Sequence, residues 1–247
     1  MATTHKVRDP RPQPAVERRA SFRVLEPAPM AAPVGESRLS RVFNFTLALV
    51  GLIVLAPLML VIAALIKFTS RGPVFYTQAR IGLDTRHTRM LHSDPRRKMD
   101  LGGRPFTIFK FRTMTVDAER HTGPVWATQR DPRVTPVGRV LRKYRLDELP
   151  QLINVLRGEM KIVGPRPERP TIFAELRDRI PEYHLRQRAK PGITGLAQIN
   201  QRYDTCLDDV RNKLRYDLEY IERQSLLEDL AIMLKTIPVV LFRKGGW

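Results

Sequence analysis

Two adjacent acidic residues, Asp147 and Glu148, are the strongest candidates for chemistry in this sequence. They lie in the stretch RLDELPQLINVLRG, between a group of arginines and an apolar pattern typical of a helix. Pro150 is tolerated in the first turn of a helix, so both acids are predicted at a helix N-terminus. There the unpaired backbone amides and the charges of Arg142 and Arg145 would favour the ionised form of Asp147. An ionised aspartate can attack phosphorus, although the spacing alone favours a simple helix cap with a solvated acidic neighbour.

The chain carries a large excess of positive charge. Its 247 residues include 43 Lys+Arg against 25 Asp+Glu, which gives a formal net charge of +18 at pH 7. Nucleic acid, anionic lipid or a phosphorylated substrate would each satisfy such a charge. No helix-turn-helix, RNA-recognition or zinc-finger pattern accompanies the basic residues, so no nucleic acid is expected as a partner. The sequence also lacks a P-loop and a G-x-G-x-x-G motif, so ATPase and dinucleotide-binding functions have no support.

A long apolar run near the N-terminus predicts insertion into a membrane. Residues 42–66 contain no charged side chain, and at about 1.5 Å per residue a helix of this length can cross a bilayer. Pro57 predicts a kink or break past the middle of the run. Basic residues on both sides draw both ends toward the cytoplasm, which favours a re-entrant helix; a kinked transmembrane helix is the alternative. These flanking residues are Arg38, Arg41, Lys67, Arg71 and Arg80.

The rest of the pattern predicts a mainly helical α+β domain with a small sheet. The segments GPVFYTQARIG and FTIFKFRTM have the composition of strands, and in the second a period of two places Lys110 and Arg112 at the end of an apolar face. Thr135 followed by Pro136 is typical of a helix N-terminus, and a charged amphipathic helix is expected at residues 207–223. The apolar stretch after it predicts an interfacial or packed helix.

These patterns divide the chain into three predicted parts. They are a disordered, proline-rich tail at residues 1–37, a membrane-inserted helix at 38–68, and a cytosolic catalytic domain with interfacial C-terminal helices at 69–247. The basic stretch between the two predicted strands is expected to be a loop.

Several longer motifs carry a resemblance to a known family. They are KFRTM, TGPVWA, DPRVTPVGRVLRKYRLDELPQLINVLRGEMKIVGPRPERP, KPGITGLAQIN and YDLEYI. From about Arg38 to the C-terminus, the chain resembles the bacterial sugar transferases, which are monotopic phosphoglycosyl transferases. The resemblance implies transfer of a sugar-1-phosphate from a UDP-sugar to polyprenyl (undecaprenyl) phosphate with release of UMP. It also implies a place at the cytoplasmic face of the bacterial inner membrane, in contact with membrane lipid, as the first membrane step of exopolysaccharide or glycan assembly.

The resemblance also implies roles for individual residues. Asp147 corresponds to the nucleophile that forms a covalent phosphosugar intermediate, and Glu148 beside it helps to hold Mg²⁺, so that both acids are candidate metal ligands. One departure from the family pattern is Ala56 before Pro57, where relatives often carry serine. By motif position, the candidate substrate-binding residues are Lys110, Arg112, Arg142, Arg166 and Asp217.

Two other functions compete with this one on sequence alone. A glycosyltransferase that moves the sugar without its phosphate would release UDP, but the D-x-D pattern often used by such enzymes is absent. A basic membrane-anchored binder without enzymatic activity would fit the charge. The sequence does not report which sugar is carried, and a homodimer is compatible with it.

Overall fold

The computed structural model describes residues 33–85, 103–118, 131–201 and 206–242 of the chain. Most of the predicted tail, most of the basic loop and the motif TGPVWA lie outside these residues. The end of the predicted tail is described and contacts residues near position 190. Val34 N donates to Arg188 O over 2.7 Å, and Glu36 forms an ion pair with Lys190 at 2.7 Å.

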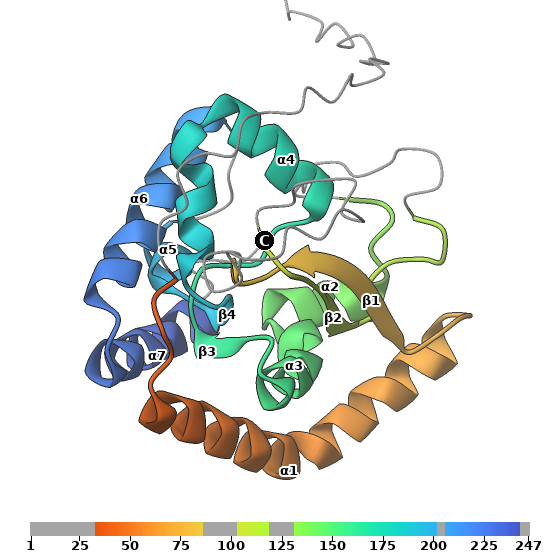
Figure 1. Cartoon of the computed structure of the whole chain (residues 1–247). Helices are drawn as coiled ribbons and strands as arrows, with labels where there is room; N and C mark the ends of the chain where they lie inside the picture. The colour runs from red at the N-terminus through yellow and green to blue at the C-terminus, as the bar shows by residue number, and fades with distance from the viewer. Residues whose placement is uncertain (1–32, 86–102, 119–130, 202–205, 243–247) are drawn as a thin grey trace, which may run out of the picture.

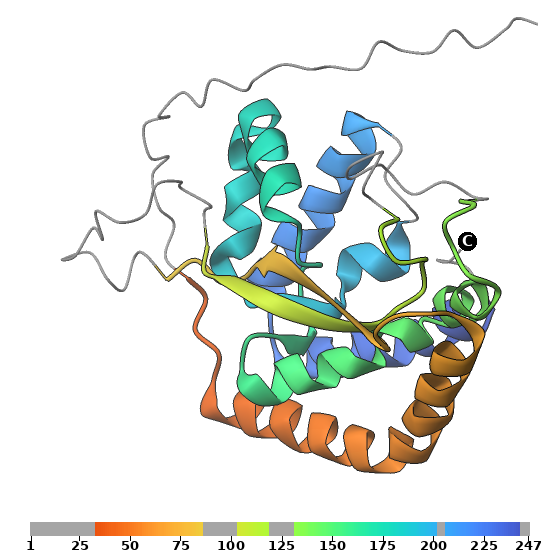
Figure 2. The same cartoon turned by 90° about the vertical axis from the view of Figure 1, so that its right-hand side faces the viewer.

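The apolar run forms one bent helix, α1, from Arg38 to Thr69. Ser37 caps its first turn by accepting a hydrogen bond from Ser40 N. Pro57 lies inside the helix, where it removes one hydrogen bond and clashes with the preceding turn. Figures 1 and 2 show that α1 changes direction sharply near its middle, as expected for a proline kink.

The described residues form two small sheets of two strands each. The predicted strands are confirmed as β1 (Phe75–Ile81) and β2 (Pro105–Phe111), which pair antiparallel. A second sheet pairs β3 (Lys161–Val163) parallel with β4 (Gly192–Thr194). This sheet was not predicted from the sequence, because strands of three residues are too short to show a period.

The remaining elements are helices, so the mainly helical α+β prediction is confirmed. Figure 2 shows β1 and β2 lying between two groups, with α4, α5 and α6 on one side and α1, α3 and α7 on the other. The predicted amphipathic helix forms with the expected bounds. The helices are α2 (Pro136–Lys143), the 3-10 helix η2 (Leu146–Gln151), α3 (Leu152–Arg157), α4 (Pro170–Arg179), the 3-10 helix η3 (Pro181–Arg188), α5 (Leu196–Asn200), α6 (Leu207–Arg223) and α7 (Leu226–Leu241).

Both halves of α1 pack against this domain. In the first half, Ala48 is fully buried in a cluster with residues of β2 and α3. In the second half, Ile62 and Ile66 pack with Phe111 of β2 and Leu141 of α2. The helix and the domain therefore share their core, and burial of a large side chain such as Ile62 or Ile66 contributes about 1.5–3 kcal/mol.

The first turn of α1 is also attached to the domain by polar contacts. Arg41 donates to the carbonyl oxygens of Val155 at 2.7 Å and Leu156 at 2.8 Å, which lie in the last turn of α3, where carbonyls have no partner within the helix. One turn later, the Asn44 Oδ1 atom accepts from Ile162 N at 2.8 Å. Arg41, expected from sequence as a topology signal, thus also serves as a cap for α3.

Candidate active site

The two acids lie on a 3-10 turn that precedes α3. The sequence predicted the start of an α-helix here, but Pro150 cannot donate the hydrogen bond that an α-helix would need, and α3 begins only at Leu152. Arg145 enters the turn with a left-handed backbone (φ 53), and its carbonyl accepts from Glu148 N at 3.1 Å. This conformation costs a residue other than glycine about 1–2 kcal/mol and is typical of functional sites.

Glu148 is surrounded by cations from three segments of the chain. Its Oε1 atom accepts from Lys110 Nζ of β2 at 2.8 Å and from Arg166 Nη2, in the loop after β3, at 2.6 Å. Its Oε2 atom is held more loosely, at 3.4 Å from Arg166 Nη1 and 3.9 Å from Arg145 Nη1. The Glu148 side chain is only 7% exposed, so these charge-assisted contacts are formed mostly away from water.

Asp147 is equally buried but has no such partners. It is 8% exposed, and no hydrogen bond or ion pair to another described residue holds its carboxylate. Burial and the neighbouring Glu148 charge raise the pKa of Asp147, while Lys110 and Arg142 oppose the shift. The expectation that the helix terminus and nearby arginines would lower this pKa is therefore wrong in direction, because burial has the larger effect.

The pKa values of Glu148 and Lys110 are both lowered, the first by its cationic neighbours and the second by burial. Burial raises the pKa of Glu148, but Arg166 and Lys110 together outweigh it and hold this pKa well below its ordinary value. Burial lowers the pKa of Lys110, and the attraction of Glu148 offsets part of that change. The two carboxylates are thus distinguished by their surroundings, since cations form ion pairs with Glu148 but act on Asp147 only from a distance.

Three of the predicted substrate-binding residues lie around this pair. Lys110 and Arg166 contact Glu148 directly, as described above. Arg142 donates from Nε to Thr113 Oγ1 at 2.9 Å, and it is close enough to lower the pKa of Asp147.

The structure does not bring the other two predicted residues to the pair. β2 ends at Phe111, so Arg112 leaves the strand and donates to the carbonyl oxygens of Ser70 and Arg71, next to the end of α1. Asp217 lies on α6 and forms a buried ion pair with Arg186, with Nη2 at 2.6 Å from Oδ2.

Sequence reasoning assigned no role to Gln198, which the structure adds to the site. Its Oε1 atom accepts from Arg166 Nη1 at 3.1 Å, so Arg166 lies between Glu148 and Gln198. Gln198 belongs to α5, within the motif KPGITGLAQIN. The motif could have drawn attention to this residue, but its contact with Arg166 depends on the pairing of β3 with β4, which brings the two loops together.

A metal ion at this site would take few ligands from the protein. Within the described ranges, no group of three or more His, Cys, Asp or Glu side chains is arranged to hold one. The pair offers the carboxylate of Asp147 and the loosely held Oε2 atom of Glu148. This donor set fits Mg²⁺, which commonly binds one or two carboxylates and completes its shell with water and substrate phosphates.

The fold and these residues agree with the result of a comparison with protein families. The model of the bacterial sugar transferase family matches residues 35–243 of this chain. The match includes α1, both sheets and the acidic pair, and it shows that the chain belongs to the bacterial sugar transferases.

Individual relatives are similar over most of this chain. It is 41% identical to the exopolysaccharide production protein ExoY of Sinorhizobium fredii over 84% of this chain and 87% of that protein. It is 39% identical, over 90% of its length, to the UDP-N-acetylgalactosamine-undecaprenyl-phosphate N-acetylgalactosaminephosphotransferase of Aeromonas hydrophila. It is 41% identical, over 81% of its length, to the UDP-glucose:undecaprenyl-phosphate glucose-1-phosphate transferase of Escherichia coli. The chain spans 47% and 39% of the lengths of these last two proteins.

Proposed function

We propose that this protein transfers a sugar-1-phosphate from a UDP-sugar to undecaprenyl phosphate, as the first membrane step of exopolysaccharide or glycan assembly. Family membership and the activities named for the Aeromonas and Escherichia relatives support the class of reaction. The observation that carries the proposal is the unequal state of two adjacent carboxylates. Glu148 is held by cations, whereas no described residue holds Asp147, so Asp147 is available to react.

The proposed reaction has two displacement steps at one phosphorus atom. A carboxylate oxygen of Asp147 attacks the phosphorus that bears the sugar, and the bond from this phosphorus to the oxygen bridging the two phosphates breaks. UMP leaves with the bridging oxygen and its electron pair. A phosphate oxygen of undecaprenyl phosphate then attacks the same phosphorus, which releases the Asp147 carboxylate and gives the polyprenyl diphosphate sugar.

In the proposed reaction, the cations around Glu148 bind the diphosphate of the substrate and neutralise its charge. Phosphoryl transfer depends mainly on positioning and on neutralising charge. Arg166 offers paired N–H donors that suit a phosphate, while Lys110 supplies a compact charge. Glu148 keeps both in place before the substrate arrives. Asp147 and Glu148 would also hold Mg²⁺, which when bound neutralises the charge of the diphosphate.

The test is nucleotide release by the purified protein with undecaprenyl phosphate and Mg²⁺. A panel of UDP-sugars beginning with UDP-glucose and UDP-N-acetylgalactosamine is compared for the wild type and Asp147→Asn. We expect UMP from the wild type and none from the variant, with full retention of folding. Release of UDP instead would show plain glycosyl transfer, and full activity of Asp147→Asn would exclude this residue as the nucleophile.

We propose further that α1 is re-entrant, with both ends on the cytoplasmic side. The helix is long and apolar enough to cross a membrane, and only 11% of its most apolar window is buried in the protein. A straight helix of its 32 residues would extend about 48 Å and separate its ends across the bilayer. Both halves of α1 pack against the same domain, and the bend at its middle makes this compatible with one membrane face.

A second apolar surface supports contact with the same membrane. Along α7, five exposed apolar side chains recur at helical spacing, while Ile232 on the other face is buried. We propose that this face lies in the membrane interface, as the amphipathic pattern predicts. The exposed residues are Leu227, Leu230, Leu234, Ile237 and Leu241.

The topology can be tested by labelling single cysteines in intact cells and in opened cells. One cysteine is placed before residue 38 and another after residue 71, each in a Cys206→Ser background. A re-entrant helix predicts that a membrane-impermeant reagent labels both only after the inner membrane is opened. Labelling of one of them from the outside would show that α1 spans the membrane.

A further inference from the structure

The loop that carries Arg166 has no regular secondary structure, yet its backbone is fixed along its length. Each of four consecutive carbonyl oxygens, from Pro165 to Glu168, accepts a hydrogen bond from a residue outside the loop. Two of the donors are backbone amides and two are arginine side chains. In chain order, the donors are Gly192 N at 3.0 Å, Arg186 Nη2 at 2.9 Å, Arg80 Nη1 at 3.1 Å and Ile81 N at 3.0 Å.

Arg186 is the most completely used of these donors. The Nε atom donates to Asp217, Nη1 to Tyr183 at 2.7 Å and Glu168 at 3.3 Å, and Nη2 to the Arg166 carbonyl. Nη2 also lies 2.6 Å from Asp217 Oδ2 in an ion pair. An arginine has five N–H groups in a fixed planar fork, and each of the three nitrogens of Arg186 donates to an acceptor here. The side chain is only 3% exposed. Asp217 and Glu168 therefore fix the Arg186 guanidinium, and its hydrogen bond to the Arg166 carbonyl fixes the backbone at Arg166.

The charges in this cluster keep Arg186 protonated. Burial disfavours its charge, but Asp217 and the other nearby acceptors raise the pKa of Arg186 above its ordinary value. Lys213 adds a second contact to Glu168, with Nζ at 2.9 Å from Oε1. Removing one charged partner from such a buried set leaves the other uncompensated, so the cluster behaves as a unit.

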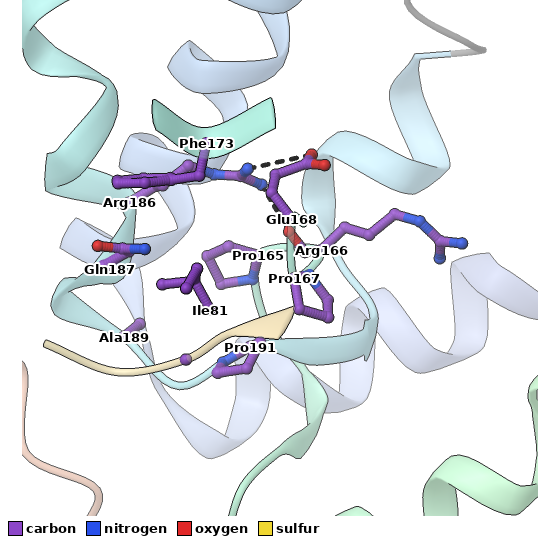
Figure 3. Close-up of a pocket in the computed structure, with 11 residues that line it drawn as sticks. Ile81, Pro165, Arg166, Pro167, Glu168, Phe173, Arg186, Gln187, Ala189 and Pro191 are labelled. Atoms are coloured by element: carbon purple, nitrogen blue, oxygen red, sulfur yellow. Dashed lines mark hydrogen bonds and ion pairs between the residues drawn. The ribbon is translucent and has the colours of Figure 1, made fainter. Parts of the chain in front are cut away.

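Among the described residues, the space beside Arg186 is small. The cavity lined by Arg186, Glu168 and the loop from Pro165 to Pro167 has a volume of about 20 Å³, enough for about one water molecule. Figure 3 shows that the Arg166 side chain points away from Arg186, whose guanidinium reaches Glu168. Arg186 and Asp217 consequently lie behind the site, on the opposite side of the loop from the acidic pair.

From these contacts we propose that Asp217 and Arg186 are positioning residues for the reaction, acting through the Arg166 backbone to aim its guanidinium at Glu148 and the substrate diphosphate. This inference rests on the proposed function for its kinetic part only. It gives Asp217 an indirect role in place of the substrate contact that its motif suggested.

The chain supplies a matched control for Asp217. Asp229 is also 2% exposed, and its carboxylate lies 3.0 Å from Lys161 Nζ in a second fully buried ion pair. It accepts a hydrogen bond from Tyr220 at 2.7 Å. Asp229→Asn therefore removes the same charge from an equally buried pair, but that pair makes no contact with the Arg166 loop among the described residues.

The first test measures the loop directly and requires no activity. Amide hydrogen exchange at Ile81, whose N–H donates to this loop at the Glu168 carbonyl, is compared for the wild type, Asp217→Asn and Asp229→Asn. We expect at least about tenfold faster exchange in Asp217→Asn and a change below about twofold in Asp229→Asn. Unchanged exchange in Asp217→Asn, or an equal rise in both variants, would overturn the proposal whether or not the enzyme reaction is as proposed.

The second test measures coupling between Asp217 and Arg166 in UMP release. Asp217→Asn should lower kcat/KM about tenfold in the presence of Arg166 but less than about twofold in an Arg166→Lys background. Arg186→Lys, which keeps the charge but not the fork, should behave in the same way. Equal losses in both backgrounds would contradict the positioning role. Absence of UMP from the wild type would instead overturn the proposed function, and the exchange result would still decide the inference.

Discussion

Two charge clusters meet at Arg166, and they are built in opposite ways. In front of the loop, the single carboxylate of Glu148 accepts from Lys110 and Arg166, with Arg145 farther away. Behind the loop, the single guanidinium of Arg186 donates to two carboxylates, Glu168 and Asp217. We call the first group the front cluster and the second the rear cluster. In the front cluster the Arg166 side chain is 33% exposed, whereas the side chains of Arg186, Glu168 and Asp217 in the rear cluster are at most 14% exposed.

This difference separates two tasks that charged residues can have. The rear cluster satisfies its own charges, which suits a rigid support. The front cluster places several cations near two acids and leaves some of their surface open, which suits binding of a diphosphate. Because Arg166 contributes its side chain to the front and its carbonyl to the rear, the support and the binding surface are joined by one residue.

The largest effect should come from breaking the rear cluster. Asp217→Ala leaves the buried Arg186 charge without its main partner, and we expect a loss of about 3–5 kcal/mol in unfolding free energy. Glu175→Ala is the control, because its ion pair with Arg179 is 55–60% exposed and such pairs contribute about 0.5 kcal/mol or less. The unfolding free energies of both variants are measured by denaturant unfolding. Equal losses would show that the buried ion pair contributes no more to stability than the exposed one.

A second prediction concerns the pH dependence of the rear cluster. Burial raises the pKa of Glu168, but Lys213 and Arg186 outweigh it and hold this pKa well below its ordinary value. The stabilisation is therefore complete above the unfolded pKa of about 4.3 and is lost as the pH falls further, by up to about 1.4 kcal/mol per pH unit. Melting temperatures from pH 6 to pH 3 should fall more steeply for the wild type than for Glu168→Gln. Parallel curves would contradict this assignment.

The smallest effect should come from the edge of the front cluster. Arg145→Gly and Arg145→Ala both remove an ion pair at 3.9 Å from a side chain that is 26% exposed, so we expect similar, few-fold losses of activity. Only glycine adopts the left-handed backbone of this position without cost. Arg145→Gly should therefore be about 1 kcal/mol more stable than Arg145→Ala, as measured by thermal unfolding. A more stable alanine variant would contradict this, because it would show that residue 145 can leave the left-handed conformation without cost.

The sequence predicted what depends on local pattern. The amphipathic spacing placed α6 correctly at Leu207–Arg223, and Thr135 with Pro136 marked the start of α2. Contacts between distant segments were not readable. Asp217 meets Arg186 across 31 residues, and Arg112 turns toward the end of α1, because tertiary packing rather than spacing decides these orientations. The same holds for the pKa of Asp147, since its burial follows from the complete fold.

The cap that Arg41 forms on α3 has a consequence for kinetics. The helix that follows the acidic pair is tied by two hydrogen bonds to the first turn of α1. Under the proposed topology, the pair is therefore held at a fixed height above the bilayer and can meet only acceptors that reach that height. The relevant concentration of undecaprenyl phosphate is then its mole fraction in the surrounding lipid. Diluting it with inert lipid should slow the reaction even when the amount per volume is constant.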